Sequence, residues 1–275
     1  MKSFWKFENR YYITAVLHAK AGISVGSGSS LMPAGSDLPV IKTPEGLPYI
    51  PGSSLKGVVR SYTERLLRTL GEMNYSIKDG KLSACDPLDE NSRCVTKEQK
   101  KRINDETKND KEFTARLWEE SCTACRLFGS PWISSRVAFQ DAPLANIDDM
   151  LRIVEVRDGV AIDRDLGTAK SGAKYDFETV PPGAKFSLRI VVENAEEWEV
   201  GLLLLALRAL KEGFLPVGGK TTRGLGWGEL LDLRVQLLTP QNLLEYIQGQ
   251  EPASVNPEDL ERAFLKALEG GTGHA

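Results

Sequence analysis

The stretch AKFSLRIVVENAEEWEVGLLLLALRALKEGFLPVGGKTTRGLGWGELLDLRVQLL, residues 184–238, decides the fold. Its beginning alternates apolar and polar side chains, which predicts a strand over residues 184–194. Residues 196–213 are rich in leucine and alanine and end in glycine, a pattern typical of a helix. Residues 228–238 predict another strand. A glycine-rich loop, 218–228, therefore lies between the helix and the last strand.

Three further elements complete the pattern. Residues 11–18 predict a strand rich in aromatic and β-branched side chains, and residues 134–142 predict another. Between them we expect a helix that starts at an N-cap, Ser53 or Ser54, and reaches Leu70, because its apolar side chains recur at helical spacing. The order strand, helix, strand, strand, helix, strand predicts an α+β fold with a ferredoxin-like (RRM-like) βαββαβ core. The aromatic signature of RNA-recognition modules is missing, so the sheet face is not the expected RNA site.

The remaining segments are predicted to be additions to a single domain spanning residues 1–275. Residues 72–130 form an insertion, which begins polar and charged, as is typical of a solvated or flexible segment. Residues 151–183 are mixed and contain glycines, which favours a projecting hairpin. The tail, 239–275, is expected to be helical, with Pro257 well placed to start its helix.

Composition narrows the class of protein. The chain has 275 residues, of which 41% are hydrophobic, enough for one sizeable core. A formal net charge of −3 predicts that any nucleic-acid site is a local basic patch. Apolar runs are too short for a membrane span, and the first residues lack the apolar centre of a signal peptide. We therefore expect a cytoplasmic protein with reduced thiols and no membrane partner.

The glycine-rich loop carries Lys220 and Arg223 and no acidic residue. Glycine lets a backbone approach a ligand and present its N–H groups, and the two cations suit phosphate, so the loop is predicted to cradle phosphates. It ends as a Walker A motif ends, but the spacing from Gly213 and the position between helix and strand both argue against nucleotide hydrolysis. A glycine-rich turn without a ligand is the alternative.

Four cysteines in a reducing compartment favour a metal site over disulfides. Cys122 and Cys125 form a Cys-x-x-Cys pair, and Cys85 and Cys94 supply a second, more widely spaced pair. Four thiolates suit a tetrahedral structural zinc, which would order an insertion too polar to fold by burial alone. A thioredoxin-like redox pair and plain buried cysteines are the alternatives.

The two histidines do not support a hydrolase with a Ser-His-Asp triad. His18 lies in a predicted strand and is interpreted as structural or as an RNA contact, whereas His274 lies in the tail.

Three motifs together carry a resemblance to a known family. PYIPGSSLKGVVR at 48–60, CTACRLFGS at 122–130 and GGKTTRGLGWGEL at 218–230 resemble the RAMP superfamily, and the order of elements matches over roughly residues 10–238. Within that family the chain looks most like the backbone subunits of type III CRISPR effector complexes. The resemblance implies guide RNA, target RNA and other RAMP subunits, including copies of this chain, as partners.

The resemblance also assigns roles to single residues. It implies that the hairpin 151–183 is a thumb that wedges between bases, and that related subunits include zinc-bearing ones. Guide-RNA contacts are expected from Ser27, Ser53, Ser54, Lys56, Arg60, Lys220, Thr221 and Arg223.

The loop motif AGSDLPV places Asp37 where such subunits carry the aspartate that cuts target RNA. A carboxylate on a polar loop can hold hydrated magnesium or a similar divalent ion, or orient an RNA 2′-hydroxyl for attack on the adjacent phosphate. Capping of a turn is the alternative role for Asp37. Two other functions stay open, a scaffold subunit that binds guide RNA without cutting, and a zinc-stabilised RNA-binding protein outside CRISPR systems.

Overall fold

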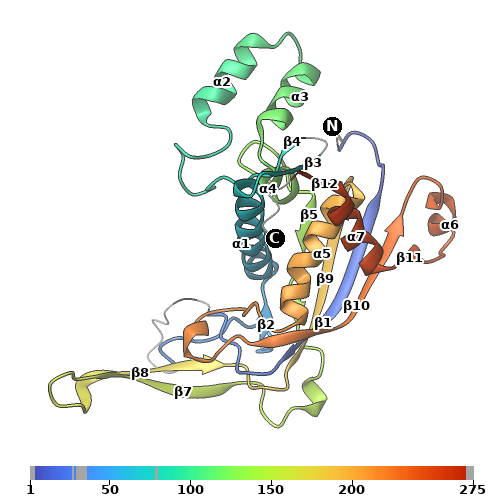
Figure 1. The fold of residues 1–275 in the computed structure, drawn as a ribbon. Coiled ribbons are helices and arrows are strands. Elements are labelled where there is room, and N and C mark those ends of the chain that lie inside the picture. Colours follow the sequence, from blue (N-terminus) through green and yellow to red (C-terminus); the bar gives the residue numbers. More distant parts are fainter. Residues whose placement is uncertain (1–3, 27, 29–35, 78–79, 271–275) are drawn as a thin grey trace.

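The protein has an α+β fold built on a central antiparallel sheet, as a computed structural model shows for residues 4–26, 28, 36–77 and 80–270 (Figure 1). The order of the five strands in this sheet is β11-β10-β1-β9-β5. These strands are β1 (Arg10–Ala19), β5 (Val137–Phe139), β9 (Lys185–Glu193), β10 (Gly228–Leu238) and β11 (Ala253–Val255).

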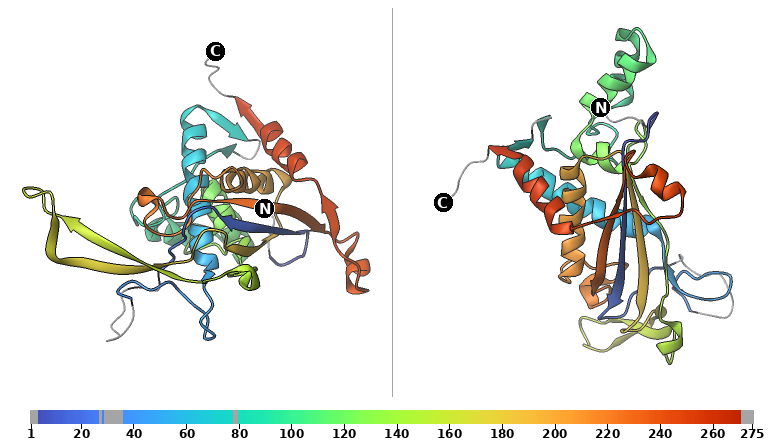
Figure 2. Two further views of the ribbon diagram at one scale, coloured as in Figure 1. Left: turned by 90° about the horizontal axis from the view of Figure 1, so that it is seen from below. Right: turned by 90° about the vertical axis from the view of Figure 1, so that its right-hand side faces the viewer.

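Alternation along β1 explains why the sheet has one covered face. Tyr11, Ile13 and Leu17 are buried, whereas Thr14 between them is exposed, as expected where successive side chains point to opposite faces. The helices α1 (Gly52–Glu72), α5 (Glu197–Lys211) and α7 (Pro257–Ala267) cover the buried face (Figure 2). Helix α5 packs closely against α7 at Gly201. A Cβ atom added to this glycine would lie 2.1 Å from the Leu260 carbonyl oxygen, so the close packing requires glycine.

The helices have the following bounds: α1 (Gly52–Glu72), α2 (Lys97–Glu106), α3 (Asp110–Glu120), α4 (Thr123–Phe128), α5 (Glu197–Lys211), α6 (Leu243–Ile247) and α7 (Pro257–Ala267), with 3-10 turns η1 (Ile147–Asp149) and η2 (Thr221–Arg223).

The start of α1 differs from the prediction. Pro51 is the N-cap, and neither Ser53 nor Ser54 caps the helix through its side chain. Instead the Gly52 N–H donates to Asp141 Oδ1 at 2.8 Å. The chain before the helix therefore supplies no cap, and a distant aspartate satisfies the first N–H group.

The strand expected over residues 134–142 is also shorter than predicted. Only β5, Val137–Phe139, joins the central sheet. The chain then turns and forms β6 (Ala142–Pro143), which pairs with β2 (Tyr49–Ile50). Asp141, at this turn, is the residue that binds the start of α1. The turn that ends this strand therefore also places Asp141 at the start of α1.

The inserted segment contains helices and a small core of its own. Val95, Ile103 and Leu117 are buried together, with the partly buried Trp132 packed against them. Helices α2 and α3 extend away from the sheet (Figure 1). The C-terminal tail contributes strands as well as helices: a three-stranded sheet has the order β12-β3-β4, with strands β3 (Tyr75–Ile77), β4 (Gly80–Lys81) and β12 (Leu268–Gly270).

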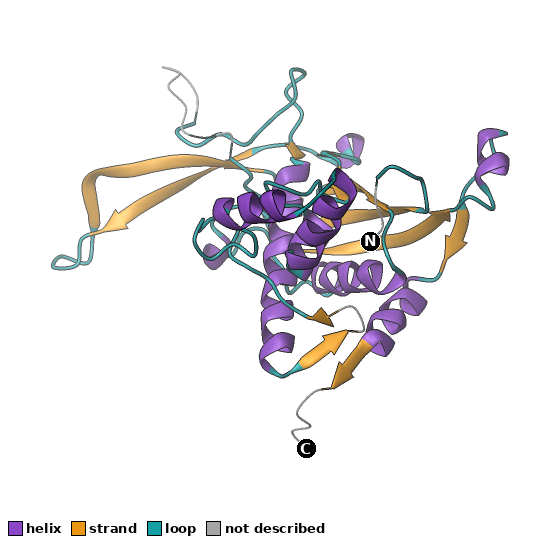
Figure 3. Ribbon diagram, turned by 90° about the horizontal axis from the view of Figure 1, so that it is seen from above, coloured by secondary structure: helices purple, strands orange, loops and turns teal. Residues whose placement is uncertain are grey.

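The predicted hairpin is present within residues 151–183. Strands β7 (Glu155–Ile162) and β8 (Ala169–Thr179) pair with each other and project from the body of the molecule (Figures 1 and 3). Of the helices in the described parts of the chain, none has the combination of length and apolar character needed to cross a bilayer.

Candidate functional site

Asp37 lies beside strand β8 and exchanges two hydrogen bonds with it. The Asp37 N–H donates to Asp176 Oδ1 at 2.7 Å, and the Asp176 N–H donates to Asp37 Oδ2 at 3.0 Å. The Ser36 hydroxyl donates to the same Asp176 oxygen at 2.7 Å. These donors, first the Ser36 hydroxyl and then the Asp37 N–H, lower the pKa of Asp176. Asp37 remains exposed, so its carboxylate is held at the hairpin and open to a ligand.

The glycine-rich loop contacts the residues on either side of Asp176. Arg223 Nη1 donates to the Tyr175 hydroxyl at 2.9 Å, and Lys220 Nζ lies 4.5 Å from the centroid of the Phe177 ring. A cation over an aromatic face is a favourable contact. Two loops far apart in the sequence therefore meet at three consecutive residues of β8.

The glycines of the loop have a structural explanation. Gly218 and Gly226 have φ angles of 92° and 83°, which favour glycine. A side chain on Gly218 would meet the Ser24 carbonyl oxygen at 2.6 Å, and one on Gly226 would meet the Val217 carbonyl oxygen at 2.4 Å. Glycine is therefore needed at 218 where the loop meets the segment after β1, and at 226 where the loop returns to Val217.

Several N–H groups of the loop are already used inside the protein, which changes the predicted phosphate cradle. Those of Gly219, Arg223, Gly224 and Gly226 each donate to a carbonyl oxygen. The exposed Arg223 and the half-exposed Lys220 and Thr221 still present their side chains. The capacity of this loop to bind phosphate therefore rests on side chains more than on the amide groups first considered.

Lys56 and Arg60 lie on one side of α1, as their spacing predicted, but they bind protein groups. Lys56 Nζ donates to Ser135 Oγ at 2.7 Å, and burial, followed by the charge of Arg60, lowers the Lys56 pKa. Arg60 Nε donates to Glu64 Oε1 at 2.7 Å and its Nη1 to the Gly129 carbonyl oxygen at 3.0 Å. In the described parts of the chain, no hydrogen bond or ion pair joins Lys56 or Arg60 to the glycine-rich loop.

Of five other residues singled out from the sequence, the structure describes three. Ser53 is exposed and Ser54 half-exposed in the first turn of α1. Ser27 lies outside the described residues. His18 Nδ1 lies 3.4 Å from Glu229 Oε1 within the sheet, and His274 is outside the described residues.

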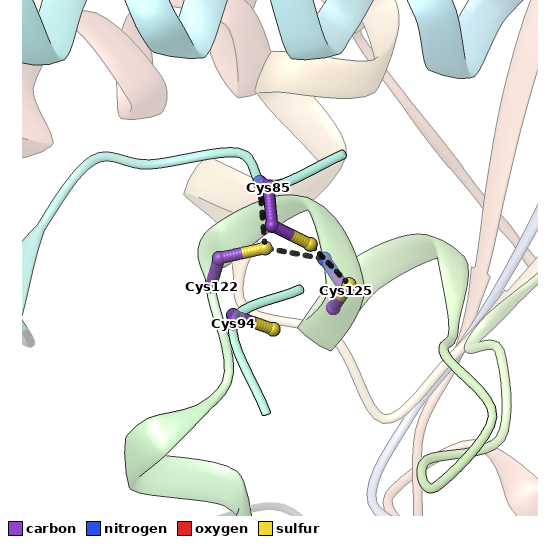
Figure 4. A group of neighbouring side chains, drawn as sticks. All are labelled: Cys85, Cys94, Cys122 and Cys125. Carbon is purple, nitrogen blue, oxygen red and sulfur yellow. Dashed lines mark hydrogen bonds between the residues drawn. The ribbon is translucent and has the colours of Figure 1, made fainter. Parts of the chain in front are cut away.

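The four cysteines come together into one cluster (Figure 4). Their sulfur atoms all lie within 4.8 Å of one another, and Cys85 Sγ and Cys125 Sγ are 3.6 Å apart. The Cys122 sulfur accepts hydrogen bonds from the Cys125 N–H at 3.4 Å and the Cys85 N–H at 3.5 Å. Sulfurs bound to tetrahedral zinc at about 2.3 Å are about 3.8 Å apart. The cluster can therefore hold a metal ion with little movement.

The chemistry of the cluster also suits a cation. Neighbouring thiols, first that of Cys125 and then those of Cys85 and Cys94, lower the pKa of Cys122 by hydrogen bonding to its sulfur. Thiolate is the form that binds metals. No disulfide joins the four cysteines.

Sequence reasoning missed Tyr175, Asp176 and Phe177. Their alternation is typical of any strand, and nothing in it indicates which loops will lie alongside. The contact between Asp37 and Asp176 spans 139 positions in the sequence, so no local pattern could have predicted it.

Comparisons with known proteins identify relatives of this chain. The chain is 25% identical over 271 residues to the CRISPR system Cms endoribonuclease Csm3 of Methanothermobacter thermautotrophicus, covering 89% of this chain and 91% of that protein. Proteins of the same name from Methanocaldococcus jannaschii and Mycobacterium tuberculosis are each 26% identical, over 267 and 250 residues. The match to the Methanocaldococcus jannaschii protein covers 92% of this chain and 90% of that relative. The match to the Mycobacterium tuberculosis protein covers 82% of this chain and 87% of that relative.

A sequence model of the RAMP superfamily matches residues 15–229. This range includes Asp37, the four cysteines and the whole glycine-rich loop, 218–228. The family predicted from the three sequence motifs is confirmed, and the chain belongs to the RAMP superfamily.

Proposed function

We propose that this chain is a guide-RNA-binding backbone subunit of a type III CRISPR effector complex and that it cuts the paired target RNA at Asp37. The observation that carries the proposal is the meeting of Asp37, Lys220 and Arg223 at one strand of the projecting hairpin. A carboxylate and two cations then lie around a single element that RNA could contact. The relatives named endoribonuclease support the same activity.

The chemistry would depend on the exposed carboxylate of Asp37. Its Oδ2 accepts from β8, and Oδ1 accepts no hydrogen bond from any residue that the structure describes. Oδ1 could thus hold a hydrated divalent ion such as magnesium, or orient the 2′-hydroxyl that attacks the adjacent phosphate. When bound, the ion would stabilise the charge that develops on the phosphate oxygens.

Guide RNA would be held mainly by the side chains of the glycine-rich loop. Lys220, Thr221 and Arg223 offer positive charge and donors for phosphates. The start of α1 would contribute Ser53, Ser54 and Lys56, and the resemblance implies a set of contacts that also includes Ser27 and Arg60. The internal bonds of Arg60 make it the weakest member of that set. The hairpin, with exposed Val156 and Val160, would wedge between bases.

The wider setting follows from the same proposal. The strand order β10-β1-β9-β5, with helices on one face, supports a ferredoxin-like core. Partners would be neighbouring RAMP subunits, including copies of this chain, in the cytoplasm.

We assign zinc to the cysteine cluster because four thiolates at this spacing suit it. Metal analysis of the purified chain should give about one zinc per chain, and Cys94→Ser should give far less.

The deciding experiment compares complexes assembled with the wild-type chain and with Asp37→Ala. Cleavage of target RNA in magnesium should disappear in the variant, while guide RNA remains bound. Cleavage that continues at the wild-type rate would exclude Asp37. If neither complex cuts, the chain is a non-catalytic scaffold. Bound RNA without repeat-derived guides would instead place the protein outside CRISPR systems.

A further inference from the structure

We propose that Asp176 is a positioning residue that holds Asp37 in its cutting orientation. This inference rests on the proposed function, because it assumes that Asp37 cuts. It concerns a residue on the hairpin, 139 positions away from Asp37 in the sequence.

The two aspartates hold each other through different groups. The Asp176 carboxylate accepts from the Asp37 backbone, whereas the Asp176 backbone donates to the Asp37 carboxylate. The first contact places the Asp37 main chain, and the second orients its side chain. One oxygen of Asp37 is thereby occupied, which directs the other toward a ligand.

Ser36 strengthens the attachment. Its hydroxyl donates to the same Asp176 oxygen, so a single acceptor holds two consecutive residues of the loop. Ser36 is 8% exposed, whereas Asp37 is exposed. The loop is therefore anchored on one side of Asp37 and turns the carboxylate outward.

The contacts of the loop after Asp37 continue along β8. Leu38 bridges to Phe177 in parallel orientation, and the Glu178 N–H donates to the Leu38 carbonyl oxygen at 3.0 Å. Glu178 also binds the Val40 N–H at 3.0 Å and Lys42 Nζ at 2.8 Å. Within the described residues, Asp176 makes the contacts at the amino-terminal end of this series. Without its carboxylate, the Ser36 hydroxyl and the Asp37 N–H would lose their acceptor, and only the Asp176 N–H would still bind the Asp37 side chain.

The proposed role needs an acceptor at Oδ1 and does not need the negative charge. Asparagine at position 176 keeps an acceptor oxygen for Ser36 and Asp37, while alanine removes it. A metal ligand or a general base would behave differently, because asparagine would lose the function together with alanine. The two substitutions therefore separate positioning from direct chemistry.

The experiment compares four variants in the assembled complex: Asp176→Ala, Asp176→Asn, Asp37→Ala and Asp148→Ala. Asp148 is an exposed control on η1, and the structure gives its side chain no ion pair or hydrogen bond with any described residue. Single-turnover cleavage rates are measured with saturating target RNA, and target affinity is measured separately.

Asp176→Ala should slow cleavage on the order of 10- to 100-fold with unchanged target affinity, because misplacement of a reacting group lowers the reaction rate by factors of this size. Asp176→Asn and Asp148→Ala should cut at close to the wild-type rate. Wild-type cleavage by Asp176→Ala would overturn the inference, and so would equal slowing by alanine and asparagine. Cleavage by Asp37→Ala would instead overturn the proposed function, so the two failures are distinguishable.

Discussion

The guanidinium of Arg60 lies beside the cysteine cluster, with Nη2 3.8 Å from Cys125 Sγ. The same side chain pairs with Glu64 and binds the Gly129 carbonyl oxygen, so helix α1 is joined directly to the chain that carries Cys125. A zinc ion with four thiolates has a net charge of about −2, which a neighbouring cation stabilises. Arg60, first considered as a contact for RNA phosphates, thus has the surroundings of an outer-shell residue of a metal site.

Replacing Arg60 with glutamine should weaken zinc binding on the order of 10- to 100-fold, because outer-shell partners orient the ligands and stabilise their charge. Competition with a chromogenic chelator measures this affinity. Arg65→Gln is the matched control, since Arg65 is exposed on the same helix and lies over the Tyr62 ring. Equal zinc affinity in both variants would contradict the assignment.

Replacing Lys220 with alanine should weaken guide-RNA binding. It should also reduce the slope of log affinity against log salt concentration by the contribution of about one phosphate contact. The lost ammonium group can no longer neutralise a phosphate. Binding is measured over a series of salt concentrations, with Lys211→Ala, an exposed lysine of α5, as control. A Lys220→Ala variant with the wild-type salt slope would show that this lysine serves only its contact with Phe177.

Replacing Gly226 with alanine should destabilise the protein more than the same change at Gly224. Both residues have positive φ, but only at Gly226 would the new side chain meet a backbone atom, the Val217 carbonyl oxygen at 2.4 Å. The shared left-handed conformation costs roughly 1–2 kcal/mol, and the collision adds about 1–3 kcal/mol. Urea unfolding of the two variants gives the difference, and equal stabilities would be the contrary result.

The protein should lose stability at alkaline pH because of Tyr11. Burial, followed by the nearby carboxylates of Glu197 and Glu196, raises the pKa of Tyr11 from 10.0 to about 12. Unfolded Tyr11 loses its proton first, so the stabilisation is complete below pH 10 and is lost as pH rises toward 12. Tyr11→Phe should show a smaller fall in the free energy of unfolding across this range. Parallel curves for both proteins would contradict the prediction.

The sequence by itself determined the elements whose patterns are local. The strand expected over residues 184–194 is observed as β9, Lys185–Glu193, and the helix of 196–213 as α5, Glu197–Lys211. The last strand, Gly228–Leu238, has the expected bounds. Periodicity of apolar side chains reports on burial within one element, so these predictions needed no knowledge of neighbours. The four cysteines could be grouped by residue type and spacing alone, because four thiols suit one tetrahedral metal site.

Only the tertiary structure decided how the candidate site is assembled. The contact of Asp37 with Asp176 and the contacts of Lys220 and Arg223 with β8 join segments that share no pattern. The same holds for Arg60, whose spacing from Lys56 predicted a shared side of α1 but not which groups would lie there. Hydrogen bonds and ion contacts between distant segments depend on the path of the whole chain, and sequence periodicity carries no record of that path.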